Sequence, residues 1–145
     1  MKNELLNQLN ANVKDFLLII ENIYFINHPN ILFGSWYLKD IVAHIVGWDN
    51  EVLRQFELFK IKNVTLPEND IDKFNVKSVN DRISFTLSQN IVELKNTNVE
   101  LNNFIKYLTE EEYNSNKIYN EWLEVEVNHY KHHTLQLKNK INNTI

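Results

Sequence analysis

The 145-residue chain is the size of one ordinary domain, and its 43% hydrophobic and 23% charged residues are usual for a globular protein and exclude a disordered one. A net charge of −4 without a basic stripe argues against nucleic-acid binding, and the lack of cysteine excludes thiolate ligands and a cysteine nucleophile. No apolar run is long enough for a signal peptide or a membrane span, so we expect one cytoplasmic domain over residues 1–145 without a membrane partner.

The sequence predicts long helices, because tight turns favour glycine and proline and the chain has only two of each. Apolar residues at three- and four-residue intervals predict a first helix over residues 2–26, which ends before Pro29. A second stripe predicts a helix that is N-capped by Ser35 and continues to about residue 60, with Trp36 and Tyr37 in its first turn. Gly47 either interrupts this helix at a mild cost or permits another group to approach closely.

Residues 61–84 form a connection too long for a simple up-and-down bundle, although its apolar residues are compatible with a short helix. A third helix is predicted over residues 86–108, and a fourth from residue 121 or 122 to about 141. Between them, Thr109 and Glu112 have the spacing of a capping box and predict a short turn of helix. We therefore expect an all-α four-helix bundle that the long connection crosses, so that helices 2 and 3 run parallel.

Three histidines are candidate ligands of a divalent metal. His129 and His133 are four residues apart, about 40° apart in helical projection, so both imidazoles point the same way. His44 lies in the apolar stripe of the second helix, where a buried imidazole needs a hydrogen-bond partner or a ligand. If the second and fourth helices are antiparallel, all three histidines lie near the middle of the bundle along its axis. Three neutral imidazoles would leave coordination positions of the metal open, as catalytic metal sites do. His132 is the alternative partner of His129, although we interpret it as solvent-facing, and His28 as an exposed turn residue.

Two further side chains belong to this prediction. Trp48 follows His44 by one helical turn and is a candidate pocket-lining residue, although simple core packing explains most of the aromatic residues. Asp40 precedes His44 by one turn and could accept a hydrogen bond from a metal-ligating imidazole, or could be a solvated surface carboxylate. No phosphate-binding loop, nucleophile motif or carboxylate pair is recognisable, so no catalytic residue is assigned.

These segments resemble the DinB-like superfamily. Residues 36–48, Trp-Tyr-Leu-Lys-Asp-Ile-Val-Ala-His-Ile-Val-Gly-Trp, resemble its second-helix motif, in which a histidine precedes a tryptophan by four residues. Residues 129–137 resemble its C-terminal H-x-x-x-H helix, and residues 70–75 look like a loop of relatives near the ClbS/DfsB branch. The resemblance implies a four-helix bundle in up-down-down-up order, often a homodimer, with nickel, zinc or iron held by His44, His129 and His133.

The resemblance also implies a function. The leading hypothesis is a metal-dependent enzyme, an S-transferase or a hydrolase, that acts on a small molecule through thiol transfer or detoxification of an electrophile. Because the chain has no cysteine, a low-molecular-weight thiol would be the cofactor or the substrate. The alternative is a non-catalytic small-molecule-binding or stress and self-protection protein of the ClbS/DfsB type, and the sequence does not separate the two.

Overall fold

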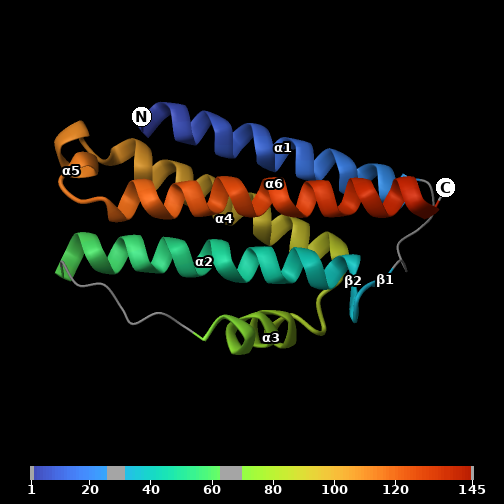
Figure 1. Cartoon of the computed structure of the whole chain (residues 1–145). Helices are drawn as coiled ribbons and strands as arrows, with labels where there is room; N and C mark the ends of the chain where they lie inside the picture. Colours follow the sequence, from blue (N-terminus) through green and yellow to red (C-terminus); the bar gives the residue numbers. More distant parts are fainter. Residues whose placement is uncertain (1, 26–31, 63–69, 145) are drawn as a thin grey trace. The chain divides into compact units, whose positions relative to one another are not determined.

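A computed structural model describes residues 2–25, 32–62 and 70–144, and most of these residues are helical (Figure 1). The helices are α1 (Lys2–Phe25), α2 (Leu38–Lys62), α3 (Ile71–Asp81), α4 (Leu87–Tyr107), α5 (Glu110–Asn114) and α6 (Ile118–Thr144). The predicted predominance of α-helix is confirmed. The chain divides into two compact units, one formed by Met1–Leu38 with Leu108–Ile145 and one by Lys39–Tyr107. None of the described helices is long and apolar enough to cross a membrane.

The first unit is built on the pairing of α1 with α6. The Asn12 side chain donates to the carbonyl of Val127 at 3.0 Å, and the Phe16 and Tyr130 rings meet edge-on with centroids 5.5 Å apart. Because the contact positions rise together along both helices, α1 and α6 run parallel. The predicted apolar stripe of α1 supplies buried side chains to this unit, namely Leu6, Leu9, Val13, Phe16, Ile20 and Ile23.

The start of α5, which belongs to the first unit, confirms the predicted capping box. Thr109 accepts from the backbone of Glu112, and the Glu112 carboxylate accepts from the backbone of Thr109, so that α5 begins with two satisfied donors. The fourth long helix begins at Ile118, a few residues earlier than predicted. The Asn116 side chain accepts from the backbone N–H of Ile118 at 3.0 Å, which satisfies one of the donors at the start of α6.

The start of α2 was predicted wrongly. The residues expected to open the helix instead form β2 (Trp36–Tyr37), which pairs antiparallel with β1 (Leu32–Phe33). Gly34 has a φ of 66°, which a two-residue hairpin turn requires and which glycine adopts without steric cost. Ser35 therefore belongs to this turn and does not cap α2, which begins at Leu38.

The second unit contains α2 and α4, which also run parallel. The Asn90 side chain donates to the carbonyl of Lys39 at 3.1 Å near the start of both helices, and the Phe56 and Phe104 rings stack at 5.8 Å near their ends. A chain can join two parallel helices only by crossing back along their length. The short helix expected within the 61–84 connection is α3, which lies between them in chain order and runs back along α2 (Figure 1).

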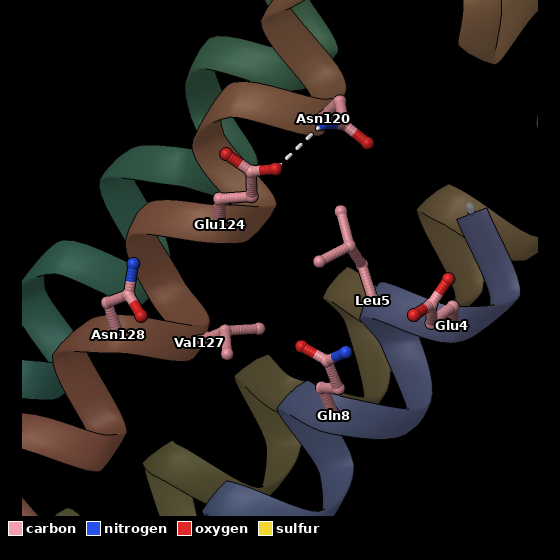
Figure 2. A pocket seen from close by; sticks show the side chains of 7 residues that line it. All are labelled: Glu4, Leu5, Gln8, Asn120, Glu124, Val127 and Asn128. Carbon is pink, nitrogen blue, oxygen red and sulfur yellow. Dashed lines mark hydrogen bonds between the residues drawn. The ribbon is translucent and has the colours of Figure 1, made fainter.

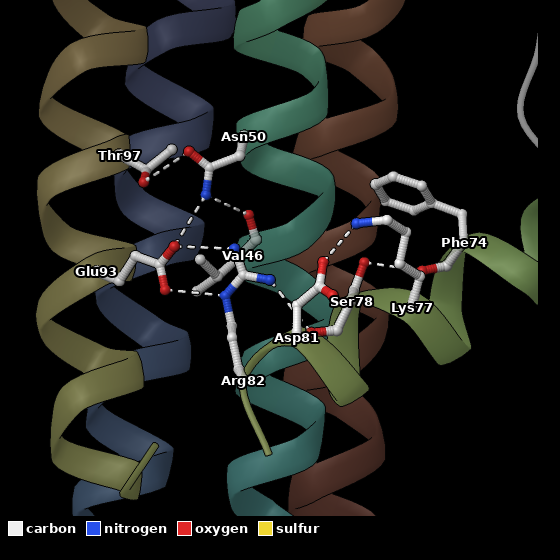
Figure 3. Close-up of polar contacts among 9 residues, drawn as sticks. All are labelled: Val46, Asn50, Phe74, Lys77, Ser78, Asp81, Arg82, Glu93 and Thr97. Carbon is white, nitrogen blue, oxygen red and sulfur yellow. Dashed lines mark hydrogen bonds and ion pairs between the residues drawn. The ribbon is translucent and has the colours of Figure 1, made fainter. Parts of the chain in front are cut away.

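A polar cluster holds α3 on this unit (Figure 3). Arg82, just after α3, donates from Nε and Nη2 to the two carboxylate oxygens of Glu93 on α4, at 2.9 and 2.8 Å. Asn50 of α2 donates to the same carboxylate at 3.3 Å. On α2, Gly47 lies so close to α3 that an added Cβ would stand 2.2 Å from Ser78 Oγ. Gly47 therefore permits the close approach of another helix, which settles the two possibilities left by the sequence.

Candidate metal centre

Helix α6 carries a pair of imidazoles on one face. His129 and His133 are one turn apart, and their Nε2 atoms lie 3.1 Å from each other, with ring centroids 4.7 Å apart and ring planes at 69°. His133 is buried, with 7% of its surface exposed, and His129 is half-buried. The i, i+4 spacing thus brings two nitrogen donors together inside the first unit, as the sequence predicted from helical periodicity.

A hydrogen bond fixes the orientation of His133. Its Nδ1 lies 2.8 Å from the side-chain oxygen of Gln136, and only an Nδ1–H can donate to that oxygen. The proton of the neutral imidazole therefore resides on Nδ1, and the Nε2 lone pair faces His129. Metal-ligating histidines are commonly oriented in this way, with the second nitrogen donating to an oxygen acceptor.

The separation of the two Nε2 atoms suits a single divalent ion. Imidazole nitrogens bind Zn²⁺ at about 2.0–2.1 Å, so two such nitrogens 3.1 Å apart subtend roughly 100° at the ion. That angle lies between the octahedral and tetrahedral values. The pair fits two adjacent coordination positions without rearrangement of the helix, and at least one further ligand is needed to hold the ion well.

The electrostatics of the pair favour the neutral, ligating form. Burial lowers the pKa of the His133 imidazole below its ordinary value of 6.5, because the charged form loses its hydration. The hydrogen bond to Gln136 opposes this shift, and the neighbouring His132 adds to it. His133 is therefore neutral at pH 7 and has a lone pair available for a metal.

The remaining predicted site residues lie on α2, in the second unit. His44 is buried, with 6% of its surface exposed, and Asp40 is half-buried one turn before it. Trp48 lies one turn after His44 and donates from Nε1 to the side-chain oxygen of Asn75 at 2.7 Å. The centroids of the Trp48 and Phe74 rings are 4.4 Å apart. Trp48 thus packs against α3, and its predicted role in lining a pocket, like that of Asp40 in orienting His44, stays a prediction.

The other two histidines were not expected to bind metal. His132 is exposed, as predicted, although the centroids of its ring and the His133 ring are 5.1 Å apart. His28 lies outside the described residues.

Sequence reasoning missed two polar residues of α6. Gln136 is three residues after His133, a spacing at which helical side chains are neighbours, so its contact with Nδ1 was foreseeable. Glu126 is three residues before His129 and only 1% exposed, and the sequence around it has the Glu-x-x-His spacing of helical metal sites.

A hollow of about 420 Å³ lies elsewhere in the first unit, between the N-terminal halves of α1 and α6 (Figure 2). Its lining residues are Glu4, Leu5, Gln8, Asn120, Glu124, Val127 and Asn128. None of them is a predicted site residue, and most are exposed. The hollow is therefore a feature of the α1–α6 surface, separate from the histidine pair.

Comparison with known proteins does not place the chain in a family. A scan against protein-family models and searches of curated proteins and of solved structures gave no match.

Proposed function

We propose that the protein binds one divalent metal ion through His129 and His133 of α6 and His44 of α2. The observation that carries the proposal is the 3.1 Å separation of the His129 and His133 Nε2 atoms, with the His133 tautomer fixed by Gln136. The three histidines are a group of residues that could supply three nitrogen ligands to one ion. Their side chains are neutral donors of the kind that zinc, nickel and iron accept.

The proposal includes the arrangement that the resemblance to the DinB-like superfamily implies. In a four-helix bundle of up-down-down-up order, α2 would run antiparallel to α6, which brings the middle of the two helices to one height. The parallel pairs α1–α6 and α2–α4 are those that this order requires. The expected C2 homodimer stays a prediction, which light scattering tests.

We further propose that this centre serves a metal-dependent reaction on a small molecule, with thiol transfer to an electrophile as the leading candidate. A divalent ion acts as a Lewis acid and lowers the pKa of a thiol so that thiolate is present at neutral pH. The chain's own contribution is to hold neutral imidazoles in a fixed orientation. Burial of His133 limits competition from protons, and Gln136 prevents the ring from turning its Nε2 away.

The test is the metal content of untagged protein, measured by mass spectrometry after reconstitution with zinc and with nickel. Wild-type protein should hold about one ion per chain, because three imidazoles form a complete catalytic-type ligand set. Replacing His44, His129 or His133 by alanine should abolish stoichiometric binding, since two imidazoles hold a divalent ion poorly. The matched controls His132→Ala and His28→Ala should retain the metal.

Two results would refute the assignment. Loss of metal in His132→Ala with retention in His133→Ala would mean that the ligands were assigned wrongly. A wild-type protein that takes up neither zinc nor nickel would remove the metal centre and favour the non-catalytic binding protein. If metal binds, a thiol-conjugation assay with a low-molecular-weight thiol and a model electrophile tests the proposed reaction.

A further inference from the structure

Gln136 contacts the nitrogen of His133 that does not face His129. The Oε1 atom of Gln136 lies 2.8 Å from His133 Nδ1, and His133 Nε2 lies 3.1 Å from His129 Nε2. All three residues are on α6, in the first unit, and the spacing of three residues between His133 and Gln136 makes their side chains neighbours. The two nitrogens of the His133 ring are therefore engaged separately, one by an amide and one by the second histidine.

The amide of Gln136 carries no charge, and this distinguishes it from the commonest partners of metal-bound histidines. Such histidines often donate their second N–H to a carboxylate, which orients the ring and also raises its basicity as a ligand. A carboxamide oxygen accepts the same hydrogen bond without the charge. Glutamate has the size and shape of glutamine, so a carboxylate could take this place on α6. The residue present thus orients His133 but strengthens it less as a ligand.

The burial of the contact increases the effect of this difference. His133 has 7% of its surface exposed, and Gln136 is half-buried. Charges in such surroundings are screened by water and salt much less than charges on the open surface. An ion bound at Nε2 withdraws electrons from the ring and makes Nδ1–H a stronger donor, and a charged acceptor binds such a donor about twice as strongly as a neutral one. The charge at position 136 should therefore change the affinity for the ion.

We propose that Gln136 is a positioning residue that sets the metal affinity of the centre. It commits His133 to bind the ion through Nε2, and its neutral oxygen keeps the affinity below the value that a carboxylate would give. This inference rests on the proposed function, because it requires an ion at His129 and His133. Without the Gln136 oxygen, the neutral His133 ring can carry its proton on either nitrogen, and the form protonated at Nε2 has no lone pair there for the ion.

The first measurement is the zinc affinity at one fixed pH, by competition with a chelator. Gln136→Leu removes the acceptor, so the affinity should fall about ten- to a hundredfold, the usual effect of losing a residue that supports a metal ligand. Gln136→Glu should bind zinc about tenfold more tightly than wild type, because the acceptor becomes charged. The matched controls are Asn139→Leu and Asn139→Glu, which change an exposed amide of the same helix in the same two ways and should bind zinc as wild type does.

The second measurement is the nitrogen NMR spectrum of the histidine rings, which reports the nitrogen of His133 that carries the proton. A merely structural role of Gln136 would leave this position unchanged. Wild-type protein should carry the proton on Nδ1 with and without zinc. Zinc-free Gln136→Leu should show both protonated forms of the neutral ring, and Gln136→Glu should restore the Nδ1 form.

The outcomes separate this inference from the metal site itself. A wild-type protein that binds no zinc refutes the proposed function. If wild type binds zinc and Gln136→Leu binds it equally tightly, or keeps the His133 proton on Nδ1, only the role of Gln136 is refuted. Gln136→Glu that binds no more tightly than wild type, or no more tightly than Asn139→Glu, overturns the effect assigned to the neutral oxygen. If Gln136→Leu does not fold, Gln136→Met replaces it in both measurements.

Discussion

Replacing Gly47 by alanine tests how α3 packs on α2. An ideal Cβ at this position would lie 2.2 Å from Ser78 Oγ and 2.4 Å from Ser78 Cβ, far inside the contact distance of two such atoms. Ser78 Cβ cannot move by side-chain rotation, so the α3 backbone must shift. Overpacking typically costs about 1–3 kcal/mol, and because the backbone must move here we expect a cost of about 2–3 kcal/mol. The helix propensity of alanine returns about 1 kcal/mol, so we expect a net loss of about 1–2 kcal/mol in the free energy of unfolding.

The effect of Gly47→Ala on the free energy of unfolding should change sign when Ser78 is replaced by glycine. Ser78→Gly removes both clashing atoms, and Gly47→Ala in that background should stabilise the protein by about 1 kcal/mol through helix propensity. Ser78→Ala is the matched control, because it removes Oγ and keeps the Cβ, so it should give little rescue. The coupling energy between positions 47 and 78 should therefore be about 2–3 kcal/mol, within the range found for contacting residues.

Urea-induced unfolding, followed by far-UV circular dichroism, measures these free energies. Tryptophan fluorescence adds a second report, to which Trp48 contributes, since its ring contacts Phe74 and its Nε1 donates to Asn75 of α3. The reasoning is refuted if Gly47→Ala alone is as stable as wild type, or if Ser78→Ala rescues it as fully as Ser78→Gly.

Three further predictions concern the polar contacts. Arg82→Ala breaks two charged hydrogen bonds to Glu93 and should lower the free energy of unfolding by about 1–3 kcal/mol, and the double variant with Glu93→Ala should lose less than the sum of the single losses in urea titrations. Thr109→Ala should cost about 1 kcal/mol through loss of the α5 cap, whereas Thr109→Ser should melt within a few degrees of wild type. In metal-free protein, the lowered pKa of His133 means that the unfolded chain binds its proton first. Stability from this group is therefore complete above pH 6.5 and decreases as pH falls toward the lower folded pKa, and urea titrations from pH 7.5 to 5 should show a smaller decrease for His133→Gln.

The features that the sequence predicted correctly are those that neighbours along the chain determine. The apolar stripe of α1 and the caps at Thr109 depend on residues within one or two helical turns, where geometry is fixed by the 3.6-residue period. The facing of His129 and His133 follows from the same period, because residues four apart on a helix always share a face. Two of the three candidate ligands could therefore be predicted from spacing alone.

Errors in the fold arose where a local pattern competed with a contact. Ser35 has the chemistry of an N-cap, but the positive φ of Gly34 permits a turn that pairs Phe33 with Trp36. The backbone hydrogen bonds of that hairpin delay α2 until Leu38. Propensity at a helix start is worth about 1 kcal/mol, which a few backbone pairings outweigh.

Contacts between residues far apart in sequence were decided by the tertiary structure alone. The role of Gly47 depends on Ser78, and the partner of Trp48 is Asn75, both of which lie on α3 within the 61–84 connection. No periodicity predicts such pairs, because each depends on how one helix packs on another. The burial of Glu126 belongs to the same class: its spacing to His129 is written in the sequence, but only packing around α6 removes its carboxylate from water.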